Sequence, residues 1–309
     1  MMDRVESSIT VPAEFRARLI SQSPAARPWL DELPGLLVQT LGAWRLSLIG
    51  APRFGGTSVV VPVQRAEGQR AALKLVSPVA DAAHEAKALQ VLKGAGVVEL
   101  YEYNPRHCAL LLELLDGARG SERADSRRMA EICGGVAAEI ASVPAPADAP
   151  SLRAGAPAWR VEFGRQHARA EAEGRGLPGP VFRRAEDAIA ELEGASDARM
   201  THGDLSFDNL IQRPDGTWLS IDPKYVCGPA ENEAHTVVRS VPWCRLDGTD
   251  PVTSSRLLIE AFCSAGGLDA GLAMRISHAR FAASYYWETE HGGDARNVEW
   301  LRLMTGDTW

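Results

Sequence analysis

A stretch of the chain at residues 201–224, THGDLSFDNLIQRPDGTWLSIDPK, brings three oxygen-bearing side chains close together in the sequence. Asp204 and Asn209 are five residues apart, and Asp222 follows after a strand-like segment. Two carboxylates among apolar neighbours repel each other unless a positive charge lies between them. Mg²⁺ meets this requirement, because it is usually held by one or two carboxylates or amides together with phosphate oxygens. The pattern is therefore consistent with a magnesium–nucleotide site.

Each of the three side chains has a distinct role if the ligand is a magnesium–nucleotide. Asn209 and Asp222, at the end of a loop and the end of a strand, can coordinate the metal. Asp204 can face the other side of the γ-phosphate, where it would orient a substrate hydroxyl and accept its proton. His202 fits a structural hydrogen-bonding role better than that of the base, because Asp204 is better placed. Lys224 could contact phosphate or lie at the surface, and the sequence leaves both open.

A lysine and a glutamate upstream supply further parts of a phosphate site. Lys74 lies in a strand-like run and suits the α- and β-phosphates, while Glu85 in the next helix would hold it by an ion pair. Most strand lysines and helix glutamates are simply solvated. The order of Lys74, Glu85 and Asp204 along the chain is what supports these assignments.

Two backbone segments would contact the rest of the nucleotide. Gly55 and Gly56 lie in a connection between two strands, where backbone N–H groups and the Ser58 hydroxyl could approach the phosphates. The glycines could equally serve the turn alone. Backbone groups between Glu113 and Leu115, at the end of the last strand of this region, would act as a hinge and hydrogen-bond the base.

The first 116 residues are expected to form helices followed by an antiparallel sheet. Residues 12–43 are expected to be helical, because apolar residues recur on one stripe from Trp29 to Leu41. β-rich runs predict the strands, and Asp81 is a suitable N-cap for the helix among them. The expected strands are 44–50, 58–64, 70–76, 97–104 and 108–115, with a helix at 81–94.

The rest of the chain reads as helical, apart from two short strands at 209–213 and 218–222 joined by a PDG turn. Helices are expected at 127–142, 158–173, 181–193, 232–240, 254–265, 268–290 and 295–303. The fold class is therefore α+β. We divide the chain into three parts. A helical leader at 1–43 packs on an N-terminal lobe at 44–116, which contains the nucleotide-binding sheet. A helical C-terminal lobe at 117–309 contains the catalytic loop, the metal site and the acceptor site.

This order of parts resembles the bilobal protein-kinase-like fold. HGD in place of HRD, and IDP in place of DFG, point to its small-molecule branch, the aminoglycoside phosphotransferases. The chain looks most like the streptomycin 6-kinase and hydroxyurea phosphotransferase group, on IDPK followed by Gly228, the leader WLDELPGLL…WRLSLIG, AALKL around Lys74, and SVPAP at 142–146. The resemblance runs from about residue 11 to about residue 245; the last sixty residues match only in being helical.

The resemblance implies an ATP-dependent, magnesium-dependent kinase that transfers the γ-phosphate to a hydroxyl of an aminoglycoside or aminocyclitol such as streptomycin, giving resistance. It also exposes a departure, because the family's GDPA-x-D-L is replaced here by GPAENEAH. Glu233 stands where the family has an aspartate that supports the catalytic loop. The activity class is then little affected, whereas the neighbouring substrate pocket could differ.

Acidic residues of the helical lobe could meet a cationic, polyhydroxylated substrate. The residues assigned to the substrate are Glu233, Asp247, Trp287 and Glu288. A charged residue on a helix is usually just solvated, so the acidic residues matter only as a group. The wider group adds Glu231, Asp250, Glu290 and Asp294, with Trp243 nearby in sequence.

Composition excludes several other classes of protein. The net charge of −7 and the absence of a Lys/Arg run do not suggest a nucleic-acid partner. No segment is apolar enough for a membrane span, and the five cysteines lack CxxC spacing, as expected of free thiols in the cytoplasm. We expect a monomer or weak dimer. A kinase of an amino sugar, metabolic sugar or other natural product is the alternative, and a catalytically silent binding protein on the same scaffold is disfavoured because Lys74, Asp204, Asn209 and Asp222 are all present.

Overall fold

The computed structural model describes residues 10–241 and 250–306. The chain divides into two compact units. The first, here called the sheet unit, extends to Gly94 and includes Val98–Asp116. The second, here called the helical unit, contains Ala95–Val97 and the chain from Gly117 onward.

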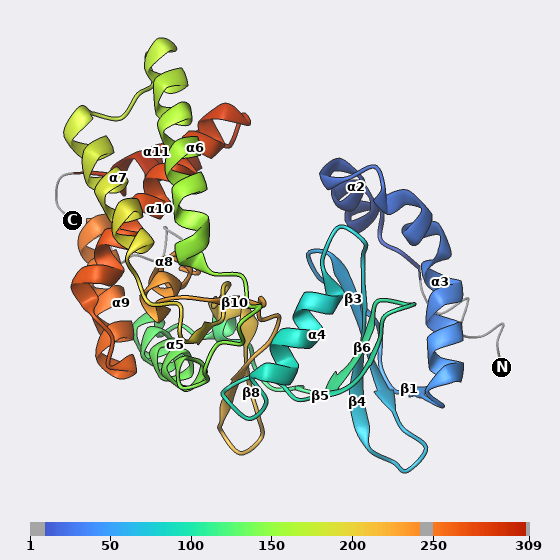
Figure 1. The fold of residues 1–309 in the computed structure, drawn as a ribbon. Helices are drawn as coiled ribbons and strands as arrows, with labels where there is room; N and C mark the ends of the chain where they lie inside the picture. The colour runs from blue at the N-terminus through green and yellow to red at the C-terminus, as the bar shows by residue number, and fades with distance from the viewer. Residues whose placement is uncertain (1–9, 242–249, 307–309) are drawn as a thin grey trace. The chain divides into compact units, whose positions relative to one another are not determined.

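The sheet unit is built around one antiparallel sheet with the strand order β1-β3-β4-β6-β5, in which β2 also pairs with β3 (Figure 1). The pairs β2–β3, β3–β4 and β5–β6 are consecutive in the chain and joined by short connections, and a helix lies between β4 and β5. The strands are β1 (Ser47–Leu48), β2 (Arg53–Phe54), β3 (Ser58–Gln64), β4 (Arg70–Val76), β5 (Leu100–Asn104) and β6 (Ala109–Glu113).

Two leader helices, α2 (Ala13–Gln22) and α3 (Ala26–Ala43), cover one face of this sheet. Side chains alternate between the two faces of a strand, so the odd-numbered residues of β3 and β4 share the face that meets these helices. The resulting core contains fully buried side chains from both layers: Leu19, Leu30, Leu33, Leu37, Val59, Val61, Val63, Leu73 and Leu75. The apolar stripe of the leader is thus the surface through which the leader packs on the sheet.

Helix α4 (Ala82–Val91) lies on the opposite face of the sheet from α3 (Figure 1). Asp81 caps it, because its Oδ1 accepts a hydrogen bond from the His84 N–H at 2.9 Å. The even-numbered residues of β4, including Lys74, face this side. The alternation of β4 therefore separates an apolar face from a face that carries a charge.

Helices form most of the helical unit (Figure 1). Helices α6 and α7 pack against each other, α10 packs against α7 and α11, and α5 packs against α9. The helices are α5 (Ser126–Ala141), α6 (Leu152–Ala172), α7 (Gly179–Glu193), α8 (Ala234–Arg239), α9 (Pro251–Gly266), α10 (Ala270–Glu290) and α11 (Ala295–Leu303), with 3₁₀ turns η1 (Gly120–Glu122), η2 (Phe207–Asn209) and η3 (Ala230–Glu233). None of the helices in the described ranges is both long and apolar enough to cross a bilayer.

Two short strand pairs interrupt these helices. Strand β7 (Met200–Thr201) pairs with β10 (Val226–Cys227), and β8 (Leu210–Gln212) pairs with β9 (Trp218–Ser220), both antiparallel. The loop after β7 and the loop after β9 are thereby brought to the same place. These two loops carry the motif residues from which the sequence analysis began.

Three expected elements differ in detail from the structure. The helical stretch expected at 12–43 consists of two helices, because Ser23 adopts an extended conformation with φ −157° before Pro24, and the α region is disfavoured for a residue that precedes proline. The connection after Gly50 contains the short strand β2. Helix α6 begins at Leu152, six residues earlier than expected, because the Ser151 hydroxyl caps it by accepting from the Ala154 N–H at 3.2 Å.

Candidate active site

In the sheet unit, Lys74 and Glu85 form a close ion pair. Lys74 is 4% exposed, and its Nζ lies 2.7 Å from Oε1 and 2.8 Å from Oε2 of Glu85. The strand sets the lysine on the face beneath α4, and the glutamate lies in the first turn of that helix. A buried ammonium held by both oxygens of one carboxylate is fixed in position.

The glycine-bearing connection is a tight turn between β2 and β3. The Gly55 N–H donates to the Ser58 carbonyl at 2.9 Å, and Ser58 itself is 6% exposed. A Cβ at Gly56 would meet no atom within 4 Å, so the backbone there is open on that side. The turn is also tied to the leader, because the Arg18 guanidinium donates to the Gly55 carbonyl and Phe54 packs on Phe15 with ring centroids 5.0 Å apart.

The segment predicted to contact the nucleotide base lies at the end of β6. Glu113 is the last residue of that strand, and its N–H donates to the Glu99 carbonyl at 2.9 Å. Leu115 is 8% exposed. The sheet unit ends at Asp116, one residue farther along the chain.

In the helical unit, hydrogen bonds join the catalytic loop (residues 202–209) to the loop at 221–225, here called the IDPK loop. The Lys224 N–H donates to the His202 carbonyl at 2.8 Å, and the Ile221 N–H donates to the Asn209 carbonyl at 2.9 Å. Gly203 makes this approach possible: its φ is +80°, and a Cβ there would lie 2.8 Å from Cβ of Lys224. The two loops therefore form one backbone-bonded assembly.

His202 is an internal brace of this assembly. It is 1% exposed, its Nε2 lies 3.1 Å from the Ile221 carbonyl, and its Nδ1 lies 3.3 Å from the Asp204 N. A carbonyl can only accept and a backbone N–H can only donate, so Nε2 carries the proton and Nδ1 is the acceptor. Burial lowers the pKa of His202, which keeps the ring neutral.

Asp204, Asn209 and Asp222 come from these two loops. The Asn209 side-chain NH₂ lies 2.8 Å from the Asp204 carbonyl and 3.5 Å from Asp204 Oδ2. Because the NH₂ group is used in this way, the Asn209 amide oxygen is directed away from Asp204. Asp222 directly follows Ile221 and has φ +61°, a left-handed conformation that non-glycine residues seldom adopt. Such conformations tend to occur at functional sites.

The electrostatic environment of Asp204 raises the pKa of its carboxyl group. Partial burial is the largest cause, opposed by the positive charge of Lys224 and supported by the negative charges of Glu233 and Asp222. A carboxylate with a raised pKa is a stronger base than an exposed aspartate. Lys224, whose place the sequence left open, is exposed and close enough to affect this ionisation.

Glu233 supports the catalytic loop from beneath. It is 1% exposed, Oε1 accepts from the Gly203 N–H at 2.6 Å and from the Thr201 hydroxyl, and Oε2 accepts from the Leu205 N–H at 3.0 Å. Both carboxylate oxygens are thus occupied inside the protein. This corrects the substrate contact expected for Glu233, because a buried carboxylate bonded in this way positions the loop and does not face a ligand.

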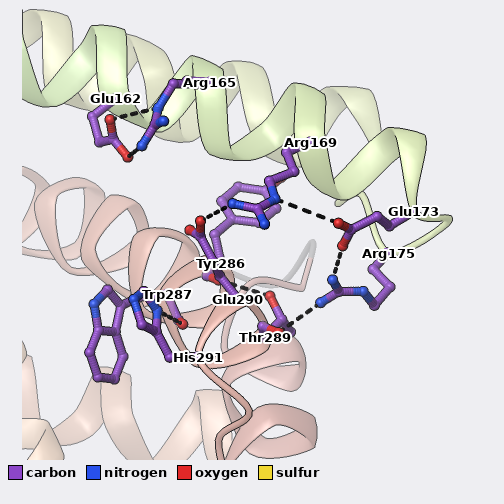
Figure 2. Close-up of polar contacts among 10 residues, drawn as sticks. All are labelled: Glu162, Arg165, Arg169, Glu173, Arg175, Tyr286, Trp287, Thr289, Glu290 and His291. Atoms are coloured by element: carbon purple, nitrogen blue, oxygen red, sulfur yellow. Dashed lines mark hydrogen bonds and ion pairs between the residues drawn. The ribbon is translucent and has the colours of Figure 1, made fainter.

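The other acidic residues of the expected substrate group are spread over several elements of the described chain. Most have structural partners: Glu231 accepts from the Asp269 N–H, Asp250 and Asp294 cap α9 and α11, and Glu290 pairs with Arg169 (Figure 2). Glu288 is partly buried near Gly293. Asp247 and Trp243 lie outside the described residues.

Trp287, by contrast, lies at a cavity. It is 52% exposed, its ring stacks on His291 at 4.5 Å between centroids (Figure 2), and it lines a hollow of about 500 Å³ in the helical unit. The cavity, here called the α6–α10 cavity, is lined mainly from helices α6, α8 and α10 and from η3, with Leu192 of α7. A second hollow of about 550 Å³, along α5 and α9, contains none of the expected site residues.

Sequence reasoning missed the basic residues of the α6–α10 cavity. Arg239, Arg280 and His235 line it together with Asn232 and Trp159. A signal was present in α10, because residues 280, 283, 284 and 287 recur at helical spacing and all line the cavity. The search for carboxylates passed over these arginines.

The fold defines the class of protein. The structure superimposes on the macrolide 2′-phosphotransferase of Brachybacterium faecium with a TM-score of 0.57, at 18% identity, over 90% of this chain and 99% of that one. At this identity the likeness concerns the fold alone. It is the protein-kinase-like fold of small-molecule phosphotransferases.

The chain belongs to the aminoglycoside/hydroxyurea antibiotic resistance kinase family, whose model matches residues 43–292. It is 32% identical to the streptomycin 6-kinase of Streptomyces glaucescens over 273 residues, which is 86% of each chain. It is 34% identical to the hydroxyurea phosphotransferase of Kitasatospora aureofaciens over 232 residues, or 73% of this chain and 66% of that one. The chain is therefore a small-molecule kinase with relatives that inactivate antibiotics, as its motifs indicated.

Proposed function

We propose that this kinase transfers the γ-phosphoryl group of ATP to a hydroxyl group of a small antibiotic-like molecule in the cytoplasm. The observation that carries the proposal is the hydrogen-bonded pair of loops in the helical unit, which holds Asp204 beside Asn209 and next to the loop of Asp222. In the sheet unit, the Lys74–Glu85 ion pair gives the second half of the phosphate-binding chemistry.

Asp204 is the proposed general base. Its raised pKa suits removal of a proton from an acceptor hydroxyl as the bond to phosphorus forms. The neutral ring of His202 donates to the IDPK loop and accepts from the Asp204 N–H, which holds the backbone of the base in place. Lys74 would bind the α- and β-phosphates of ATP, and Ser58 and the turn at Gly55–Gly56 would also contact the phosphates. The backbone of Glu113 and Leu115 would bind the nucleotide base.

Asn209 and Asp222 fit the coordination of Mg²⁺. Both offer hard oxygen atoms, and the described residues contain no cluster of three or more His, Cys, Asp or Glu side chains that could form a closed metal site. Mg²⁺ is typically bound in this way, by few protein ligands together with phosphates and water. When bound, it would neutralise charge on the transferring phosphoryl group.

The acceptor has two candidates. An aminoglycoside or aminocyclitol such as streptomycin is favoured by the relatives that are streptomycin 6-kinases. A small molecule without several positive charges, as in the hydroxyurea phosphotransferase, is favoured by a specific observation, the arginines of the α6–α10 cavity.

The test is ADP release in the presence of ATP, Mg²⁺ and each acceptor, using wild type, Asp204→Ala and Asp208→Ala. Loss of the base should lower kcat by about 10²- to 10⁴-fold. Asp208 is the matched control, because it is exposed, lies in the same loop and contributes only its carbonyl to the hydrogen bond from Arg119. Equal rates for wild type and Asp204→Ala would reject the assigned base, and the absence of any turnover would favour a catalytically silent protein.

A further inference from the structure

The α6–α10 cavity has the size and the lining of a ligand site. Its volume of about 500 Å³ falls within the range of small-molecule pockets, and all its lining residues belong to the helical unit. Two tryptophans, Trp159 of α6 and Trp287 of α10, supply flat apolar faces, and small residues such as Gly155 and Ala283 leave room beside them. The charges of the cavity decide what it could hold.

Arg280 is the most informative of these charges. Its Nη1 donates to the Asn232 side-chain oxygen at 2.9 Å, and within the described ranges no carboxylate lies within ion-pair distance of it. Burial lowers the pKa of its guanidinium, and the nearby charge of Glu233 opposes that effect. The Glu233 oxygens are already occupied by the catalytic loop. A mostly buried guanidinium with N–H donors to spare requires acceptor atoms from elsewhere.

His235 adds an unsatisfied polar atom to the same lining. It is 2% exposed, and its Nδ1 has no hydrogen-bond partner. The ring meets Phe281 edge-on, with centroids 4.4 Å apart, which fixes its plane. Burial and the charges of Arg280 and Arg239 lower its pKa well below the ordinary value, so the ring stays neutral. Native proteins rarely leave such atoms unpaired unless a ligand or water completes the bond.

The remaining charges leave the cavity positive. Arg239, at the end of α8, is exposed and has no ion-pair partner among the described residues. Glu162 is the single carboxylate in the described lining, and Arg165 binds both its oxygens, at 2.9 and 2.7 Å (Figure 2). Beyond Trp287, the charges of Arg169, Glu173, Arg175 and Glu290 pair among themselves (Figure 2). Arg280 and Arg239 therefore line the cavity, and the one carboxylate in its described lining is already bound by Arg165. The charges of Glu233 and Asp204 act on Arg280 from outside this lining.

The cavity is also connected to the catalytic loop. Asn232, which accepts from Arg280, directly precedes Glu233, whose carboxylate holds the loop at Gly203 and Leu205. Arg280 is close enough to Asp204 for the charge of that carboxylate to act on it. A molecule bound against Arg280 would therefore lie beside the element that positions the base.

We propose that the α6–α10 cavity binds the acceptor and selects a hydroxyl-bearing molecule with no net positive charge. Carbonyl or carboxylate oxygens of this molecule accept hydrogen bonds from Arg280 and Arg239. Its flat face lies against Trp159 and Trp287. This inference rests on the proposed kinase function and names its substrate class. A polycation would bring like charges against two arginines, which is unfavourable in a partly buried site.

The test compares acceptors of different charge in wild type, Arg239→Gln and Arg239→Glu. Streptomycin serves as the cationic probe, hydroxyurea as the neutral one and gluconate as the anionic one. We expect kcat/KM for hydroxyurea or gluconate to exceed that for streptomycin at least tenfold. Arg239→Gln should raise the KM of the preferred acceptor about tenfold, with a smaller effect on the KM of ATP, and Arg239→Glu should improve the use of streptomycin. Arg239 is exposed, so both variants should fold.

Arg302→Gln is the matched control, because that arginine is exposed on α11 and pairs with Glu299. A preference of wild type for streptomycin would overturn the proposal. If no probe is phosphorylated, thermal shifts decide: stabilisation by gluconate or hydroxyurea that is lost in Arg239→Gln supports the proposal, and stabilisation by streptomycin alone, or by none of the probes, overturns it. A failure of the proposed kinase function itself would show as an absence of binding of ATP with Mg²⁺, whereas a failure of the cavity proposal alone would leave that binding intact.

Discussion

Lys74 in the sheet unit is held by the carboxylate of Glu85, whereas the catalytic loop of the helical unit is held by backbone hydrogen bonds to the IDPK loop and by the bonds of Gly203 and Leu205 to Glu233. The first arrangement follows from strand alternation and one helix turn. The second joins segments of the chain that are up to 30 residues apart. The difference teaches that the Glu85 carboxylate fixes the position of a charged side chain, whereas the Glu233 carboxylate fixes the backbone conformation of a loop.

The largest effect is expected from Lys74→Met, which removes the charge proposed to bind phosphate. The kcat/KM for ATP should fall by about 10²- to 10³-fold, as when one charge-stabilising donor is lost. Stability should fall by about 3–5 kcal/mol, because Glu85 then lacks its ammonium partner. In Lys74→Met/Glu85→Leu the stability should return while the activity does not.

Urea denaturation and steady-state kinetics measure the two effects separately. Lys93→Met is the control, since that lysine is exposed and only loosely paired with Glu99, at 3.4 Å. Full activity of the double variant would show that Lys74 serves the fold alone.

Glu233→Gln tests the other carboxylate. Thr201, Gly203 and Leu205 all donate hydrogen bonds to the two oxygens of Glu233. A glutamine replaces one of these oxygens with an NH₂ group, so at least one donor loses its acceptor, at a cost of about 1–3 kcal/mol. We expect kcat to fall about tenfold with little change in the KM of ATP, and amide exchange in residues 201–209 to become faster. Glu231→Gln, two residues earlier in η3, is the control. Unchanged exchange in Glu233→Gln would show that other contacts hold the loop.

The pH dependence of kcat tests the environment of Asp204. Its carboxylate form must accept the proton, so kcat should fall as the pH drops through a pKa that burial raises above 3.8. Lys224 opposes this shift, so Lys224→Gln should move the acidic limb of the profile to higher pH, while Lys224→Arg should leave it in place. A limb that moves to lower pH in Lys224→Gln would contradict the assigned electrostatics.

The smallest effect is expected from Arg18→Ala in the leader. Loss of its hydrogen bond to Gly55 should loosen the glycine-bearing turn and raise the KM of ATP by about three- to tenfold, the factor for one hydrogen bond. Arg16→Ala is the matched control, because Arg16 lies on the same helix and pairs with Asp31 at 2.7 Å. Equal KM values in the two variants would remove the leader from nucleotide binding.

Much of the fold could be predicted from local patterns. Strands β3 and β4 and helix α11 have the boundaries expected from hydrophobic periodicity and turn residues, because these elements carry strong signals over their whole length. The leader was expected to be helical, and its division at Ser23–Pro24 lies ahead of the apolar stripe that begins at Trp29. The start of α6 was missed because Pro157 lies within the helix, where a proline normally argues for a loop.

The substrate side of the site was the least predictable. Acidic residues near the end of the chain were expected to form a cleft, yet Glu290 pairs with Arg169, and Asp294 caps a helix. A carboxylate's partner depends on which helix packs beside it, and sequence spacing does not report that. For the same reason, Arg280 and Arg239 drew no attention until the helices placed them at one cavity.

The sequence by itself determined the family, the order of the elements and the residues available for chemistry, because periodicity and motif spacing are properties of neighbouring residues. Only the tertiary structure decided that Glu233 is buried beneath the catalytic loop, that Asp222 adopts a left-handed conformation, and that two arginines line the α6–α10 cavity. These features arise where distant segments pack together. Their energies depend on burial and on partners that no local pattern contains.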